Sequence, residues 1–253
     1  MLLAVKNLSK EFGGLRAVNE IRMELSDGEL VGLIGPNGAG KTTFFNLVTG
    51  VYEPTEGEIL FDNQPIQGKK TYAITQGGIA LTFQNIRLFA NLTVLENVKT
   101  ACHFRVKYSV VEAILRLGRY VPEEDKIEAK AMELLEIFGL AGKADELACN
   151  LPYGEQRRLE IARALATEPK LLLLDEPAAG MNPQETKELT ELIQWIREKF
   201  NLTVLLIEHD MSLVMKLCER IYVLDYGTVI AHGTPEEIRQ TPRVIQAYLG
   251  EEG

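Results

Sequence analysis

The nonapeptide Gly35-Pro36-Asn37-Gly38-Ala39-Gly40-Lys41-Thr42-Thr43 matches the pattern G-x-x-x-x-G-K-[ST] at every fixed position. An apolar run at residues 29–34 predicts a short buried strand before it, and residues 43–49 predict a helix that Gly50 ends. The glycines let successive backbone N–H groups point inward, and the start of the helix adds partial positive charge. An ordinary glycine-rich turn would not need this order of strand, loop and helix. We therefore predict that all nine residues line a site for the phosphates of a nucleotide.

A second signal is the unbroken apolar run at residues 171–174, which ends in Asp175 and Glu176. Such a run predicts a central parallel strand covered on both faces, and α/β sheets bind ligands at the carboxyl ends of their strands. Lys41 can place its ammonium group on the β and γ phosphates, while Thr42 and Asp175 can give oxygen ligands to Mg²⁺. Glu176 can then polarise an attacking water as a general base. Acids that merely end a strand at the surface are the alternative, and the pairing with the phosphate loop favours a nucleoside triphosphatase.

Composition excludes several other functions. The chain has 253 residues, of which 46% are hydrophobic and 25% charged, with a net charge of −9. These values are typical of a soluble globular protein, and the acidic balance argues against nucleic acid as a partner, because phosphate contacts need a basic surplus. The N-terminus lacks the apolar core of a signal peptide, and the apolar runs are too short to span a bilayer. We expect a cytosolic protein whose membrane role is peripheral.

The cysteines and histidines are few and scattered. An odd number of cysteines without paired spacing predicts reduced thiols at Cys102, Cys149 and Cys218. The same scatter predicts no metal cage built from cysteine or histidine.

The middle of the chain changes from strand to helix. Residues 79–83 predict a strand that leads to Gln84, and residues 91–139 have a helical pattern. The run 101–121 mixes basic and apolar residues, so it is either a helix that faces a partner or lipid head groups or, as we favour, an ordinary solvated helix. Three apolar residues after Gln84 either meet a membrane-embedded partner or belong to a local core, and these are Leu88, Phe89 and Leu92.

The ends of the chain add strands and one well-marked helix. Residues 1–34 read as strands, and Phe12, beside two glycines, is either an exposed platform for a base or a core residue. Asn182 and Pro183 suit the cap and first position of a helix that continues to Phe200. Strand signals follow at residues 204–207 and in a hairpin around Tyr226.

The phosphate site is incomplete on this reading, because no arginine is placed to close over the γ-phosphate. The helix start at residues 151–156 contains Gly154 and can offer an anion site. Two copies of the chain, arranged head to tail, would give two closed sites with one such helix start in each.

The order of these motifs resembles the ATP-binding subunit of ABC transporters along the whole chain. Residues 35–42 are similar to Walker A, Gln84 to the Q-loop, residues 171–175 to Walker B, and His209 to the switch histidine of the H-loop. The family's Leu-Ser-Gly-Gly-Gln signature corresponds here to Leu151, Pro152, Tyr153, Gly154 and Glu155. The segment 151–165 and the ending 233–250 are similar to the LivG-type subunit of branched-chain amino-acid importers.

The resemblance implies a fold, a site and partners. The fold would be α/β, a P-loop NTPase (RecA-like) with a mostly parallel sheet, an antiparallel β subdomain and a helical signature subdomain. One ABC domain would have its core at 1–86 and 157–253 and the helical subdomain at about 87–156. Catalysis would involve Glu176, His209, Gln84 and Lys41, with Gln84 also near Mg²⁺, and Phe12 would stack on the adenine of ATP.

The same resemblance implies an ATP-hydrolysing subunit that energises a membrane importer of branched-chain amino acids. It would be a peripheral subunit on the cytoplasmic face of the cell membrane. Its partners would be transmembrane permease subunits, a second ATP-binding subunit and, indirectly, a solute-binding protein. Amide or urea import, lipopolysaccharide export, a soluble ABC-type ATPase and a non-catalytic scaffold are the alternatives.

Two residues depart from the family pattern. Pro152 replaces the signature serine, whose hydroxyl contacts the γ-phosphate across the dimer, and Asn182 replaces the usual aspartate of the D-loop. Proline has neither a hydroxyl nor an N–H group. We expect weaker closure of the ATP-bound dimer without loss of activity.

Overall fold

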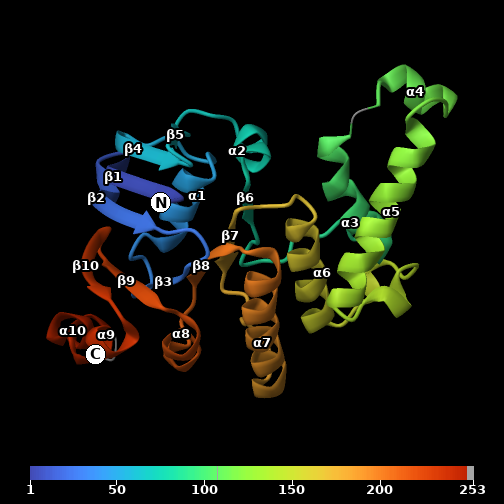
Figure 1. The fold of residues 1–253 in the computed structure, drawn as a ribbon. Coiled ribbons are helices and arrows are strands. Elements are labelled where there is room, and N and C mark those ends of the chain that lie inside the picture. Colours follow the sequence, from blue (N-terminus) through green and yellow to red (C-terminus); the bar gives the residue numbers. More distant parts are fainter. Residues whose placement is uncertain (107, 250–253) are drawn as a thin grey trace. The chain divides into compact units, whose positions relative to one another are not determined.

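The computed structural model describes residues 1–106 and 108–249, and the chain divides into two compact units (Figure 1). Unit 1 consists of Met1–Gln84 and Lys170–Gly253, and unit 2 of Asn85–Pro169. The boundaries expected from the sequence, after residues 86 and 156, remain a prediction about subdomains. The two divisions differ at residues 85–86 and 157–169, which the contacts place in unit 2.

Unit 1 is built on a six-stranded sheet in the order β10-β9-β3-β8-β7-β6. All neighbouring strands are parallel except β10 and β9, which form the antiparallel hairpin expected around Tyr226. Every residue of β3, β7 and β8 is buried, as their unbroken apolar sequences predict. The strands are β3 (Leu30–Ile34), β6 (Ile79–Leu81), β7 (Leu171–Asp175), β8 (Thr203–Ile207), β9 (Arg220–Asp225) and β10 (Thr228–Gly233).

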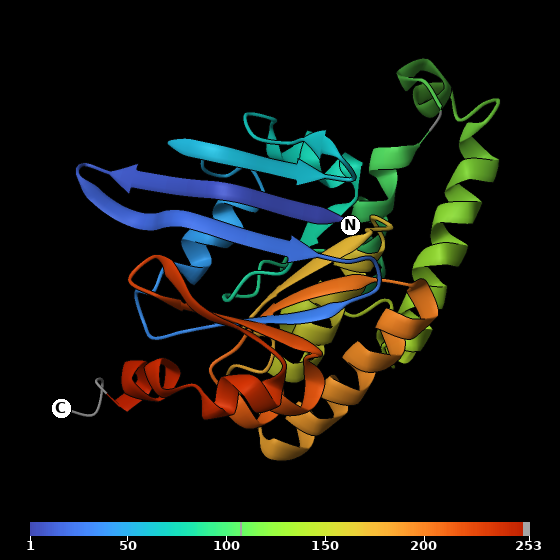
Figure 2. The same ribbon diagram turned by 60° about the vertical axis from the view of Figure 1, so that its left-hand side comes forward.

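A second, antiparallel sheet completes unit 1 in the order β2-β1-β4-β5. Figure 2 shows this sheet in blue, with α1 (Lys41–Val48) between it and the six-stranded sheet. Phe44 and Phe45 of α1 belong to one apolar core together with residues of both sheets. The predicted mostly parallel sheet with an antiparallel β portion is therefore confirmed. The strands of this sheet are β1 (Leu3–Phe12), β2 (Leu15–Leu25), β4 (Glu56–Phe61) and β5 (Gln64–Pro65).

The longest helix of unit 1, α7 (Pro183–Phe200), begins as its sequence predicts. The Asn182 side chain accepts hydrogen bonds from the N–H groups of Gln184 and Glu185, at 3.0 Å each, and the Glu185 carboxylate accepts one from the Asn182 N–H at 2.9 Å. These bonds satisfy helix donors that would otherwise lack partners. The remaining helices of unit 1 are α2 (Thr71–Gly77), α8 (Met211–Leu217), α9 (Pro235–Gln240) and α10 (Pro242–Leu249).

Unit 2 is helical, as predicted, with α3, α5 and α6 packed together. Asn97 of α3 is fully buried and hydrogen-bonds both the N–H and the carbonyl of Phe89, which ties the entry loop to the helix. The helices are α3 (Val94–Cys102), α4 (Val110–Leu115), α5 (Tyr120–Ile137) and α6 (Tyr153–Leu165), with 3₁₀ turns η1 (His103–Arg105), η2 (Ala141–Lys143) and η3 (Ala148–Asn150).

The run 101–121 is not one helix, which corrects the sequence-based interpretation. It passes through η1 and the short α4, which ends where Arg116 adopts a left-handed conformation with φ 51°. Lys107, part of the basic run, lies outside the described residues. Three apolar side chains of α4, those of Val111, Ile114 and Leu115, are exposed instead of packed, with Ile114 at 74%. Phe89 is also exposed, at 53%, so a purely local core does not account for it.

Within the described residues, no helix has the length and hydropathy needed to cross a membrane.

Candidate active site

The phosphate loop joins β3 to α1 in a shape that requires glycine at two positions. Gly35 has φ 150°, and a Cβ atom there would lie 2.1 Å from the carbonyl oxygen of Leu224. Gly40 has φ 99°, and a Cβ atom would lie 2.4 Å from the carbonyl oxygen of Ala17. Both contacts are far shorter than van der Waals distance, so backbone packing selects these glycines. No side chain caps α1, whose first-turn N–H groups form the anion-binding end of the helix.

Lys41 points back over this loop. Its ammonium group donates hydrogen bonds to the carbonyl oxygens of Gly35 at 2.6 Å and Pro36 at 2.9 Å, and the residue is only 6% exposed. The cation is therefore held at the loop, where an anion would meet it. Thr42, the next residue, is exposed, and Thr43 is half-buried.

The register of the six-stranded sheet brings the predicted chemistry to one edge. Asp175 at the end of β7 pairs with Ile207 at the end of β8, and Ile207 pairs with Leu33 of β3, just before the phosphate loop. Because these strands are parallel, their carboxyl ends meet at the same edge. Shortly after these strand ends come Gly35, Glu176 and His209. These residues therefore lie at the same edge of the sheet.

Glu176 is in contact with two other predicted catalytic residues, Gln84 and His209. Its Oε2 accepts a hydrogen bond from Nε2 of Gln84 at 2.9 Å, and its Oε1 lies 2.6 Å from Nε2 of His209. A carboxylate only accepts hydrogen bonds, so the tautomer of His209 that carries its proton on Nε2 is the one that can donate to Glu176. The side chain of Glu176 is 15% exposed, and its backbone has φ 47° with its N–H bonded to the carbonyl of Ile207. The carboxylate is thus oriented from two sides and still reaches solvent.

Asp175 and Thr42 suit a magnesium ion by the chemistry of their donors. Asp175 is a carboxylate only 6% exposed at the end of β7, and Thr42 offers an exposed hydroxyl in the first turn of α1. Mg²⁺ takes oxygen ligands and is commonly held by one or two protein groups plus substrate phosphates. The described residues contain no cluster of three or more histidine, cysteine or acidic side chains that could hold a metal by itself. A magnesium site shared between protein oxygens and the phosphates of the nucleotide therefore fits the residues present.

Glu208 belongs to this edge but was not singled out from the sequence. It is 4% exposed, and its carboxylate accepts hydrogen bonds from the N–H groups of Ala178 at 2.9 Å and His209 at 3.2 Å. Burial raises the pKa of its carboxyl group. Glu208 therefore ties the loop after Glu176 to the residue that contacts Glu176. Glu208 could have been found from the sequence, because it directly follows the apolar strand β8, and Asp175 likewise stands at the end of the apolar strand β7.

Phe12 lies at the end of β1 and is 41% exposed, which excludes the core alternative. Its ring packs edge-on against Tyr52 with centroids 5.2 Å apart, and the ammonium group of Lys10 lies 5.1 Å from its centroid. An exposed ring held in this way can serve as a stacking platform.

The signature segment belongs to unit 2 and begins α6. Leu151 is buried, Pro152 occupies the cap position without a side-chain cap, and Tyr153 is 45% exposed. Glu155 is held by Lys143, whose ammonium group lies 2.6 and 2.8 Å from the carboxylate oxygens. Behind it, the fully buried Arg157 pairs with Glu160 at 2.7 Å.

Comparison with known proteins finds similar proteins and family models along most of the chain. A family model described as ABC transporter matches residues 18–179, and one described as branched-chain amino acid ATP-binding cassette transporter matches residues 228–253. The high-affinity branched-chain amino acid transport ATP-binding protein LivG of Escherichia coli K12 is 51% identical over 99% of this chain and 98% of its own. BraF of Pseudomonas aeruginosa, with the same description, is 46% identical over the same shares. The lipopolysaccharide export ATP-binding protein LptB of Escherichia coli K12 is 38% identical over 99% of this chain and 98% of its own.

Solved structures give the same fold. An ABC-transporter ATP-binding cassette in its ADP conformation superposes with a TM-score of 0.85 at 30% identity, covering 98% of each chain. A dimeric bacterial ABC transporter cassette superposes with a TM-score of 0.79 at 27% identity, covering 92% of this chain and 99% of its own.

Proposed function

Because this chain belongs to the ATP-binding cassette family of ABC transporters, we propose that it is the ATP-hydrolysing subunit of an importer of branched-chain amino acids. The observation that carries the chemistry is Glu176, held between Gln84 and His209 at the edge where the phosphate loop begins. The transported solute is inferred from the similarity of this chain to known transport proteins. Identity to LivG is 51%, against 38% to the lipopolysaccharide-export protein LptB, and the family model at residues 228–253 describes branched-chain amino-acid transporters.

Glu176 is the proposed general base. It would accept a proton from the water that attacks the γ-phosphate, while His209 and Gln84 hold its two oxygens in place. Phosphoryl transfer depends mainly on in-line positioning and on neutralising the charge that develops. Lys41 and the loop amides at residues 35–43 would supply positive charge, and the ring of Phe12 would stack on adenine.

Mg²⁺ would be held by Thr42 and Asp175, with Gln84 nearby. When bound, the ion would neutralise part of the charge on the transferred phosphoryl group. The buried carboxylate of Asp175 and the exposed hydroxyl of Thr42 support this assignment.

Closure of the site would need a second ATP-binding subunit, either another copy or a similar sister chain. The segment 151–155 of one subunit would then face the ATP that is bound by the phosphate loop of the other. A dimeric cassette among the similar structures supports this arrangement. Transmembrane permease subunits would bind the pair at the cytoplasmic face of the membrane, and a solute-binding protein would be an indirect partner.

The test of this proposal is ATP-dependent transport of branched-chain amino acids by the purified complex. The chain is co-expressed with candidate permease subunits, purified as a complex and placed in liposomes that contain ATP. Uptake of labelled L-leucine should require both ATP and an intact Glu176, with Glu191→Gln on exposed α7 as the control. ATP hydrolysis without leucine, isoleucine or valine uptake would reject the solute while keeping the ATPase. Failure to co-purify with any membrane protein would instead favour a soluble ABC-type ATPase.

A further inference from the structure

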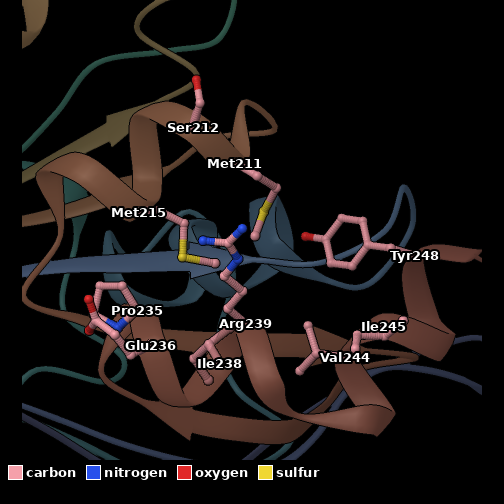
Figure 3. Close-up of a pocket in the computed structure, with 10 residues that line it drawn as sticks. All are labelled: Met211, Ser212, Met215, Pro235, Glu236, Ile238, Arg239, Val244, Ile245 and Tyr248. Atoms are coloured by element: carbon pink, nitrogen blue, oxygen red, sulfur yellow. The ribbon is translucent and has the colours of Figure 1, made fainter.

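A cavity of about 670 Å³ lies in unit 1 between α8, α9 and α10 (Figure 3). Its walls are mainly apolar, with two methionines from α8, Ile238 from α9, and Val244 and Tyr248 from α10. Its volume is within the range of small-molecule sites, which are typically apolar with a few polar groups that orient the ligand. None of these residues has a role in the proposed hydrolysis.

A single cation enters this apolar space. Figure 3 shows the side chain of Arg239 rising from α9 toward the side chains of Met211 and Met215. Within the described part of the chain, neither the side chain of Arg239 nor that of Glu236, one turn earlier on α9, takes part in a hydrogen bond or ion pair. An arginine without a carboxylate partner is suited to bind one from a ligand. The site therefore matches a molecule with an aliphatic body and a carboxylate.

Two of the helices that line the cavity, α8 and α10, are also next to residues of the proposed nucleotide site. Helix α8 begins at Met211, and its cap Asp210 directly follows His209 and accepts a hydrogen bond from the Ser212 N–H at 2.8 Å. Helix α10 places Val244 and Tyr248 in the cavity. Its residues Arg243, Gln246 and Ala247 instead line a second cavity together with residues 36–39 of the phosphate loop. A shift of α8 would thus move His209, and a shift of α10 would change the surroundings of the phosphate loop.

We infer that the cavity between α8, α9 and α10 is an effector site for a small aliphatic carboxylate, whose binding changes the rate of ATP hydrolysis. An aliphatic α-amino acid is one source of this chemistry, since Glu236 could take its ammonium group. A short fatty acid is the other source. Helices α9 and α10 fall within residues 228–253, which match the branched-chain amino-acid transporter model. The choice of an amino acid rests on the proposed function, but the carboxylate site does not.

The test is calorimetric titration of the full chain with L-leucine, 4-methylpentanoate and octanoate in turn. At least one should bind with saturation, and Arg239→Met should weaken it by about tenfold or more, because the charge is lost while the apolar stem stays. Met215→Trp should also weaken binding, by filling the cavity without changing charge. Arg119→Met removes an exposed arginine of unit 2 and should leave binding unchanged. Binding of leucine that Glu236→Gln weakens identifies the amino acid, whereas binding of the two amine-free acids alone identifies the fatty acid.

The second measurement is steady-state ATP hydrolysis with and without the ligand that binds. The ligand should change KM for ATP or kcat in the wild type and have no effect in Arg239→Met. Absence of binding by all three probes at millimolar concentration would overturn the site, as would equal binding by Arg239→Met. Binding without a change in hydrolysis would overturn the effector role. If the chain hydrolysed no ATP at all, the proposed function would fail, and the titrations would still decide the carboxylate site.

Discussion

The Nε2 atom of His209 lies 2.6 Å from Oε1 of Glu176, although 33 positions separate the two residues in the chain. The contact exists because β7 and β8 are adjacent and parallel, with Asp175 in register with Ile207. It fixes the direction of the carboxylate toward the imidazole. A general base must be oriented before its pKa matters, and here the sheet supplies the orientation.

The first prediction concerns the base itself. Glu176→Gln keeps the size of the side chain and one of its two acceptor oxygens, so it can keep one of the contacts with Gln84 and His209, but it removes the ability to accept a proton. Hydrolysis should fall by about 10²- to 10⁴-fold, the usual contribution of general base catalysis, while ATP still binds. Steady-state phosphate release and ATP titration measure the two properties separately. Full turnover in this variant would exclude Glu176 as the base.

Glu208 should hold the backbone of His209 in place beside the proposed base. Glu208→Ala removes the acceptor for the Ala178 and His209 N–H groups, so the free energy of unfolding should fall by about 1–3 kcal/mol. The backbone of His209 would also lose a restraint, so kcat should fall more than KM for ATP changes. Urea unfolding and steady-state kinetics test both effects. Unchanged kcat in a folded variant would mean that Glu208 does not position His209.

The charge of Glu208 also predicts a dependence on pH. Burial raises the pKa of Glu208 above its ordinary value of 4.5, so the folded state favours the neutral acid. The stabilisation from Glu208 is full below that ordinary pKa and is lost as the pH rises through the raised pKa. Glu208→Gln cannot ionise. The unfolding free energy of the wild type, relative to this variant, should therefore fall as the pH rises from the ordinary pKa of 4.5 through the raised pKa. A difference that rises over this interval would contradict the assigned direction.

The cysteines allow a separate test of burial. Burial raises the pKa of Cys218 to about 12 and also raises the pKa of Cys102, whereas Cys149 is exposed. Since the thiolate is the reactive form, iodoacetamide near pH 8 should label Cys149 first. Peptide mapping by mass spectrometry measures the three rates, and labelling in urea gives the control in which all three react. Equal rates in the native protein would be inconsistent with this core.

Local signals in the sequence were sufficient for the elements that carry the chemistry. The phosphate loop is marked by Gly35 and Gly40, whose contacts with neighbouring backbone leave no room for a Cβ atom. The apolar run before Asp175 marked β7, and Asn182 with Pro183 marked the start of α7. For β7 and α7 the deciding interaction lies within a few residues or in the burial of one strand. The phosphate loop was recognised by its motif, although its glycines are selected by the distant backbone of Ala17 and Leu224.

Features that depend on distant contacts were not predictable in the same way. Continuous helical periodicity at residues 101–121 did not show that α4 would end at the left-handed Arg116. The role of Glu208 depends on Ala178, which is 30 positions away. The cavity around Arg239 arises only where α8, α9 and α10 come together, and none of these short helices has a long apolar repeat.

The last prediction tests the departure at Pro152. Proline caps α6 without a side-chain hydrogen bond, and it cannot offer a hydroxyl to a γ-phosphate. Pro152→Ser should strengthen ATP-driven dimerisation by about 1.5–3 kcal/mol, the worth of a hydrogen bond to a charged group. The measurement is sedimentation in the Glu176→Gln background, where ATP persists. Pro152→Ala is the matched control, because it removes the proline without adding a hydroxyl.

Serine at this position would also cap α6, which typically stabilises a helix by about 1 kcal/mol. Thermal unfolding without nucleotide measures that cap effect alone. If serine and alanine support dimerisation equally, the hydroxyl makes no contact with ATP, and the closure of this dimer does not depend on the signature serine of its family.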